Sequence, residues 1–309
     1  MMFNSINAMI KYAKKGEPLK LAVACAHDKD VLLSLNKAVQ NNLVIPVFIG
    51  DAAKLNSIIK TLAVNFQAEV IDSKSDEEAC EIAVKMVSSG KAQMVMKGLV
   101  NTSTFLKAIL NKEWGLRHKE LLSFVSIFIF SRHRKRPILI TDPAINISPD
   151  LMQKKAIIEN AVDVAHKLGI KIPKVALVCA VESVSPEMQA TIDAAVLSKM
   201  NDRGQIKGCV VDGPLAFDNI ISVNAAKHKG IKSPVAGDTD IIVVPYIEVG
   251  NVLYKTFNYF SAEFCAGVIA GASAPIVLTS RSDTFEVKFN SIVMASILAK
   301  HDKNKFVEK

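Results

Sequence analysis

Short runs of β-branched and other apolar residues alternate with longer helical patterns along almost the whole chain. The apolar runs are nearly continuous, which is typical of strands covered on both faces, whereas a half-exposed sheet alternates apolar and polar residues. Since parallel strands need a crossover connection, usually a helix, the pattern predicts an α/β protein with mostly parallel strands. The predicted strands are 19–26, 43–50, 68–73, 92–98, 137–143, 174–180, 206–213, 239–247 and 274–280.

Helical patterns fill the intervals between these runs. Their apolar residues recur every three to four positions, as on one face of a helix that packs against a sheet. The predicted helices are 29–41, 76–89, 104–111, 149–168, 186–201, 253–271 and 286–299, with an amphipathic helix inside the first 16 residues.

Two turns mark where the chain divides. Thr141, Asp142 and Pro143 end one strand with a proline-marked turn, and a long helix follows. The chain crosses back between the domains near Ser280 and Arg281, because the last helix must pack against a sheet. The predicted domains are therefore a discontinuous one, residues 1–141 plus 281–309, and an inserted one, residues 142–280.

The charge balance is basic, with 38 lysines and arginines against 30 acidic residues and a formal charge of +8. This excess suits a phosphorylated small molecule, a nucleic acid or an anionic membrane equally well. Aromatic residues make up only 6% of the chain, which disfavours a protein that stacks on single-stranded bases. No nucleic-acid-binding motif is present, so a nucleic-acid partner is a distant third hypothesis.

The cysteines and the apolar runs bear on the compartment. The five cysteines are far apart and form no CxxC pair, which favours buried free thiols in a reducing cytosol over disulfides. The longest apolar run, 121–130, is far shorter than the ~20 residues that span a bilayer. We therefore expect a soluble, cytoplasmic protein without a membrane partner.

Several familiar catalytic motifs are absent from the sequence. It has neither GxGxxG after a strand nor GxxxxGK[ST], so two common phosphate-binding loops are excluded. HExxH, paired CxxC and GxSxG are missing too, and the six histidines are scattered. We expect that any catalysis uses neither a metal nor a Ser-His-Asp triad.

Polar residues gather where the strand 92–98 ends and the next helix begins. Glycine there lets backbone approach a ligand, and the amides at a helix start attract anions. An ordinary strand–loop–helix junction with a polar cap fits the same pattern. The candidate anion-binding residues are Lys97, Gly98, Asn101, Thr102, Ser103 and Lys107.

A second group follows the predicted strand 274–280. Arg281 beside the hydroxyl of Ser280 can hold a phosphate, and Asp283 or Glu286 can take a proton. An exposed loop in which Asp283 caps the next helix is the competing interpretation. Two further turns, Asp212-Gly213-Pro214 and Gly250-Asn251, carry little weight by themselves.

Taken together and in order, these segments resemble the phosphate acyltransferases, specifically the phosphate acetyl/butyryltransferase family. The resemblance covers about residues 20–299. It rests on DGPL at 212–215, SPVAG at 233–237, GNxxYK at 250–255 and the Ser-Arg pair at 280–281. The segments 96–117, 140–146 and 278–283 look closest to its phosphate butyryltransferase branch.

The resemblance implies two three-layer α/β/α domains, like those of isopropylmalate dehydrogenase, with the site in a cleft between them. It implies a homodimer or larger homo-oligomer. The implied reaction converts a short-chain acyl-CoA, butyryl-CoA foremost, and inorganic phosphate to acyl phosphate and CoA, without a cofactor. Holding both substrates in one site supplies up to ~7–11 kcal/mol of the rate advantage.

Matching the family position by position assigns roles to individual residues. Arg281 would bind phosphate and the developing negative charge, and Ser280 the thiol or the carbonyl oxygen. Lys107 stands where the acetyl branch has an anion-binding arginine, so it lacks the bidentate fork. The acetyl branch's base position is Val287 here, so Asp283 or Glu286 would have to act as the base, or the mechanism would do without one.

Other positions depart from the butyryl branch. Phe124, Ile129 and Tyr246 replace its usual histidine and acidic residues, and a basic cluster follows at Arg132, His133, Arg134, Lys135 and Arg136. We interpret this cluster as a solvated loop, with a binding patch as the alternative. The departures motivate a second hypothesis, a noncatalytic relative that binds CoA or anions. The nearest alternative among enzymes is an acyltransferase for another acyl chain.

Overall fold

In the computed structural model, which describes residues 3, 5–62, 68–130, 136–260 and 263–307, the chain forms two compact units. Unit 1 comprises residues 1–4 and 121–265, and unit 2 comprises residues 5–120 and 266–309. These limits lie earlier in the chain than the divisions at 141/142 and 280/281 expected from the turns. The assignment of functional domains at those turns stays a prediction.

Unit 2 contains a mostly parallel sheet in the strand order β3-β2-β1-β4-β11-β10. β1 pairs in parallel with β2 on one side and with β4 on the other, and β11 is parallel to β4 but antiparallel to β10. β10 belongs to unit 2 from residue 266 onward. The strands are β1 (Leu19–Ala24), β2 (Val44–Gly50), β3 (Glu69–Asp72), β4 (Met94–Lys97), β10 (Phe264–Ala270) and β11 (Ile276–Val277).

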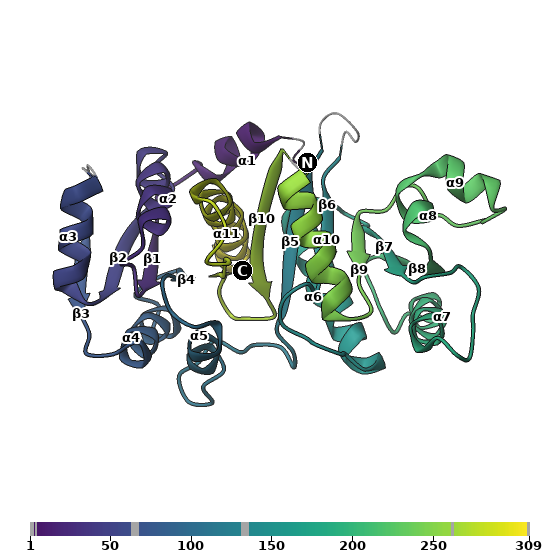
Figure 1. The fold of residues 1–309 in the computed structure, drawn as a ribbon, viewed down its shortest axis with the longest axis horizontal. Coiled ribbons are helices and arrows are strands. Elements are labelled where there is room, and N and C mark those ends of the chain that lie inside the picture. The colour runs from purple at the N-terminus through teal and green to yellow at the C-terminus, as the bar shows by residue number, and fades with distance from the viewer. Residues whose placement is uncertain (1–2, 4, 63–67, 131–135, 261–262, 308–309) are drawn as a thin grey trace. The chain divides into compact units, whose positions relative to one another are not determined.

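Two helices of unit 2 show how short polar side chains cap a helix start. Asp28 accepts a hydrogen bond from the backbone N–H of Val31 at 2.8 Å, and Ser75 accepts one from Glu78 at 3.2 Å. Helix α2 packs on α11, and α4 packs on α5 (Figure 1). The helices are α1 (Ile6–Ala13), α2 (Lys29–Gln40), α3 (Ala52–Leu62), α4 (Asp76–Ser88), α5 (Thr102–Ile109) and α11 (Phe285–Val307).

Unit 1 contains a sheet in the strand order β5-β6-β9-β7-β8, in which β5 is antiparallel to β6 and the other pairs are parallel. Its strands are β5 (Ser123–Ile129), β6 (Ile138–Thr141), β7 (Lys174–Val178), β8 (Val210–Leu215) and β9 (Ile241–Val243). Its helices are α6 (Leu151–Lys167), α7 (Gln189–Asp202), α8 (Phe217–Ile221), α9 (Val223–His228) and α10 (Ile247–Phe260).

The structure confirms the α/β class and all nine predicted strands, and it corrects one helix. The predicted helix 253–271 is wrong in its second half, because α10 ends at Phe260 and 264–270 form strand β10. Every residue of β10 is buried, so its continuous apolar run serves a strand covered on both faces. The run 121–130 likewise contains a strand, β5, that the sequence analysis left unassigned.

The remaining sequence expectations concern single features. All five cysteines are free, and four are buried while Cys209 is half-buried. In the described part of the chain, no helix has the length and hydropathy needed to cross a membrane. Of the basic cluster, Arg136 pairs with Asp238 and Asp240. Arg132, His133, Arg134 and Lys135 lie outside the described residues.

Candidate functional site

The sheet of unit 2 reverses its direction of growth at β1. From β1 the chain builds β2 and β3 on one side, then returns to place β4 on the other. Ligands of open α/β sheets bind at such a switch point, beyond the carboxyl ends of the two strands. In this unit that point lies at the loops that follow Ala24 in β1 and Lys97 in β4.

Gly98 fastens these two loops together. Its N–H donates to the carbonyl of Ala24 at 2.8 Å, and the N–H of Leu99 donates to the carbonyl of Cys25 at 2.8 Å. A Cβ atom on Gly98 would lie 2.2 Å from the carbonyl oxygen of Cys25. Glycine is therefore required here because two backbone segments approach each other closely. The sequence analysis had instead expected the glycine to let backbone approach a ligand.

Helix α5 begins directly after this loop, and its first N–H groups lack a side-chain cap. Asn101 occupies the N-cap position, but its side chain makes no capping hydrogen bond. Its Oδ1 accepts a hydrogen bond of 2.8 Å from Nη2 of Arg281 instead. Asn101, Thr102 and Ser103 are exposed, so the positive end of the helix faces solvent beside a guanidinium.

The loop that carries Arg281 follows β11, and hydrogen bonds with two buried side chains hold it in place. The buried carboxylate of Asp283 accepts the N–H of Ser280 at 2.7 Å. Lys288, also buried, donates from Nζ to the carbonyl oxygens of Ser280, at 3.3 Å, and Asp283. Ser280 and Arg281 remain exposed, and the hydroxyl of Ser280 lies 3.0 Å from that of Ser282. Two buried side chains thus orient an exposed Ser-Arg pair.

Three cations converge on this place. Lys97 is 3% exposed, and its Nζ donates to the carbonyl oxygen of Gly98 at 3.1 Å. Burial, and then the positive charges of Arg281 and Lys288, lower the pKa of Lys97 from its ordinary value. Because a bound anion would offset both burial and repulsion, this arrangement is suited to phosphate.

The candidate proton acceptors occupy different environments. Asp283 is buried and uses its carboxylate to hold the N–H of Ser280, a residue that precedes helix α11, so the competing interpretation of an exposed loop is wrong for this residue. Glu286 lies exposed in the first turn of α11. The catalytic role of either residue stays a prediction.

The cysteine beside the site is an unlikely nucleophile on chemical grounds, since a thiolate and not a thiol attacks. The Cys25 thiol is buried after β1, and Cys80, burial and Asp76 raise its pKa. Its Sγ lies 3.4 Å from Oδ1 of Asp76. The raised pKa keeps Cys25 a neutral thiol, which is a poor nucleophile.

The other predicted site residues belong to unit 1, where their glycines permit close packing. A Cβ on Gly213 would lie 2.7 Å from Cβ of Leu177, and one on Gly250 would lie 2.7 Å from Cα of Pro143. Asp212 accepts the N–H of Gly213 at 2.8 Å, and Pro214 is buried at the end of β8. Asn251 donates to the carbonyl of Pro143 at 3.4 Å. Substrate binding by these residues stays a prediction.

The three unusual residues also lie in unit 1. Phe124 and Ile129 are buried in β5, and the ring of Phe124 meets that of Tyr254 edge-on at 6.1 Å. The ring of Tyr246 lies 5.3 Å from Nζ of Lys154. Each of these side chains therefore has a packing role in its own unit.

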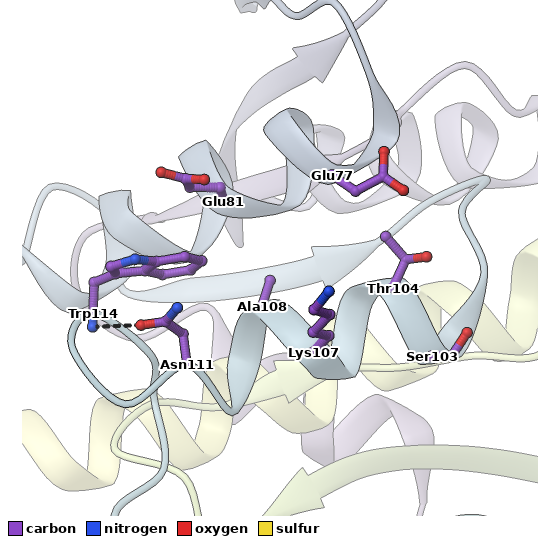
Figure 2. Close-up of a pocket in the computed structure, with 8 residues that line it drawn as sticks. All are labelled: Glu77, Glu81, Ser103, Thr104, Lys107, Ala108, Asn111 and Trp114. Carbon is purple, nitrogen blue, oxygen red and sulfur yellow. Dashed lines mark hydrogen bonds between the residues drawn. The ribbon is translucent and has the colours of Figure 1, made fainter.

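Helices α4 and α5 border a pocket of about 380 Å³ (Figure 2). Lys107 and Ser103, both predicted from the sequence, lie on its wall. The sequence analysis gave no role to the pocket's other residues or to Lys288. Four of these pocket residues lie in the segment 96–117 that carries the family resemblance, and Glu77, Glu81 and Lys288 lie in helices without a motif. The lining residues are Glu77, Glu81, Ser103, Thr104, Lys107, Ala108, Asn111 and Trp114.

Comparison with known proteins identifies the family of the chain. The phosphate acetyl/butaryl transferase family matches residues 76–296, well over half of the chain. The chain belongs to this family. Its match contains α4, α5, the Arg281 loop and most of α11, and hence every residue of the cationic cluster.

Individual relatives cover nearly the whole chain. The phosphate butyryltransferase of Clostridium beijerinckii is 46% identical over 303 residues, 98% of this chain and 100% of that protein. The phosphate acetyltransferase of Thermotoga maritima is 43% identical over 285 residues, 92% of this chain and 97% of that protein. The crystal structure of a branched-chain phosphotransacylase from Enterococcus faecalis V583 matches with a TM-score of 0.79 at 33% identity, covering 92% of this chain and 99% of that one.

These matches confirm the predicted family and the α/β fold of this acyltransferase relative. They do not bear on the predicted cleft between domains, the roles of single residues or the absence of a cofactor, which stay predictions. Within unit 2, the segment around residue 100 and the Arg281 loop do meet, at the Asn101–Arg281 hydrogen bond.

Proposed function

We propose that the protein transfers the acyl group of a short-chain acyl-CoA, butyryl-CoA foremost, to inorganic phosphate. The observation that carries this proposal is the convergence of Arg281, Lys97 and the start of α5 on one place. Relatives named for butyryl, acetyl and branched-chain transfer support the reaction class and leave several acyl chains to test.

Each group at the site meets a need of the reaction. A phosphate oxygen attacks the thioester carbonyl carbon, the carbon–sulfur bond breaks, and CoA leaves as a thiolate that takes up a proton. Arg281 and the N–H groups of α5 hold the phosphate, and the buried Lys97 at the end of β4 adds a positive charge. The Ser280 hydroxyl donates to the carbonyl oxygen or to the thiolate as charge develops there. In the reverse direction the CoA thiol loses its proton first.

Thiol release from acyl-CoA tests the proposal. We expect release of CoA from butyryl-CoA that requires added phosphate, persists in the presence of a chelator, and is accompanied by butyryl phosphate. Acetyl-CoA, isobutyryl-CoA, isovaleryl-CoA and hexanoyl-CoA rank the acyl chains. If folded protein bound CoA but released no thiol from any of these, the noncatalytic hypothesis would replace this one.

The lowered pKa of Lys97 gives the reaction a pH signature. Lys97 loses its proton at a lower pH than an ordinary lysine, whose pKa is 10.5, so kcat/KM for phosphate should fall as pH rises into that range. Bound phosphate favours the ammonium, so the fall in kcat should come at higher pH than the fall in kcat/KM. Profiles of both constants measure this difference. A Lys97→Met variant that kept the same alkaline fall would contradict the assignment.

We further propose that the protein acts in the cytosol as a homodimer or larger homo-oligomer. The free, mostly buried cysteines support a reducing compartment. Helix α10 of unit 1 supports self-association, because Val252, Tyr259 and Phe260 are 64%, 66% and 86% exposed on it. Exposed apolar groups of this size are typical of interaction surfaces.

A further inference from the structure

The pocket between α4 and α5 is distinct from the phosphate-binding groups described above, although it begins beside them. Thr104 and Ser103, near the start of α5, line one end, and Asn111 and Trp114, beyond the end of α5, line the other (Figure 2). Its volume of about 380 Å³ falls within the range of small-molecule sites. With ~1.5 Å per residue, α5 sets the two ends roughly 12 Å apart.

Trp114 is held in place by the turn that closes α5. Oδ1 of Asn111 accepts the N–H groups of Glu113, at 2.9 Å, and Trp114, at 3.1 Å. Gly115 packs so closely on this turn that a Cβ there would lie 2.3 Å from the carbonyl oxygen of Asn111. Nζ of Lys85 lies 5.2 Å from the centroid of the Trp114 ring and is paired with Glu81 at 2.5 Å. The ring is therefore fixed by its surroundings before any ligand arrives.

The side chain of Trp114 lies at the wall of the pocket. Trp114 is only half-buried, and its ring borders the pocket instead of filling the core (Figure 2). An indole face that lines a cavity offers a stacking surface for a planar, aromatic ligand group.

The charged groups around the ring further limit which chemical groups the ligand can carry. Lys107 is exposed on the pocket wall and makes no ion pair within the part of the chain that the structure describes. Glu77 and Glu81 line the opposite wall from α4. A purine with an exocyclic amino group can stack on the indole and donate to a carboxylate, while its phosphate meets the lysine. An adenine nucleotide satisfies all of these groups at once.

We infer that Trp114 is the stacking platform for the adenine of CoA and acyl-CoA. This inference rests on the proposed function, since that function makes CoA the nucleotide in question. The adenosine end lies against Trp114 and Asn111, its phosphates reach Lys107, and the pantetheine arm follows α5 toward Asn101 and Arg281. The pocket thereby separates recognition of the nucleotide from the chemistry at the thioester.

Intrinsic fluorescence tests the site directly, because Trp114 is the single tryptophan of the chain. Adenosine 3′,5′-bisphosphate should quench this fluorescence in a saturable manner, and butyryl-CoA, which carries the same adenine, should quench it too. Pantetheine, which lacks the nucleotide, should leave the fluorescence unchanged. Absence of quenching by either nucleotide ligand, or equal quenching by pantetheine, would overturn the inference.

Kinetics supply the second test. Trp114→Ala should raise KM for butyryl-CoA roughly 5- to 100-fold, the usual cost of losing one base–aromatic stack, with kcat little changed. Trp114→Phe keeps an aromatic face and should restore most of the affinity. KM for butyryl-pantetheine should be the same in all three proteins, which a merely structural role for Trp114 would not produce.

The two proposals fail in different ways. If the wild-type protein turns over butyryl-CoA while Trp114→Phe and Trp114→Ala keep the wild-type KM, the platform is refuted and the reaction stands. If no acyl-CoA is turned over, the reaction is refuted, and the titration with adenosine 3′,5′-bisphosphate still decides whether the pocket binds an adenine nucleotide. Should Trp114→Ala fail to fold, the phenylalanine variant and the titration of the wild type carry the test.

Discussion

Replacing Arg281 by alanine should lower turnover of butyryl-CoA by roughly 10²- to 10³-fold while the protein stays folded, which is the usual effect of removing a group that stabilises transition-state charge. Arg281 is exposed, and its side chain is held by Asn101, so alanine removes no buried packing. Initial rates of thiol release, with a thermal unfolding curve for each protein, measure the effect.

Companion variants show whether the shape of the guanidinium matters. Arg281→Lys keeps the positive charge but loses the two-pronged fork, so it should recover only a small part of the rate. Asn101→Ala removes the acceptor that orients Arg281, and it should raise KM for phosphate more than it lowers kcat. Arg203→Ala, at an exposed arginine after α7, is the matched control and should be silent. Near-normal turnover in Arg281→Ala would refute the role assigned here.

Among the helices, those that the sequence predicted well are the ones with a clear helical repeat. The segments 76–89 and 149–168 carry a helical repeat and a polar cap, and they form α4 and α6 almost as predicted. The segment 253–271 was misjudged because α10 and β10 are both rich in apolar residues and lie close together in the sequence. A fully apolar strand shows no alternation, and its preference for a sheet arises from burial on both faces.

The candidate site was predictable to the extent that it uses strand ends. Lys97 ends a strand, and Asn101 and Arg281 lie shortly after strands, so the rule that ligands bind at carboxyl ends brought them together in advance. Lys288 was missed because it lies inside the helix α11, where a lysine is ordinarily solvent-exposed. Lys288 orients the loop 280–283 through hydrogen bonds to two of its carbonyl oxygens, and only the tertiary structure shows these contacts.

Replacing Gly98 by alanine should destabilise the protein by about 3 kcal/mol and abolish phosphate-dependent turnover, because added volume in a tightly packed place forces backbone to move. The added Cβ would lie 2.2 Å from the carbonyl oxygen of Cys25 and 2.6 Å from that of Ala24. Both atoms are backbone of β1 or the residue after it, and backbone held in a sheet does not rotate aside. The β4–α5 loop would therefore lift away from β1 and carry Asn101 with it. Thermal unfolding and thiol release measure the two effects.

Gly90→Ala distinguishes this clash from the general cost of substituting a glycine. Gly90 follows α4 with φ +78°, and nothing lies within 4 Å of its added Cβ. Alanine there should lower the free energy of unfolding by only about 1 kcal/mol, the cost of a left-handed backbone for a residue with a Cβ, and turnover should be unchanged. If Gly98→Ala were no more costly than Gly90→Ala and equally active, the loop would tolerate displacement. The start of α5 would then not need to rest on β1 for the site to work, and the phosphate would have to be held by the Arg281 loop and Lys97 alone.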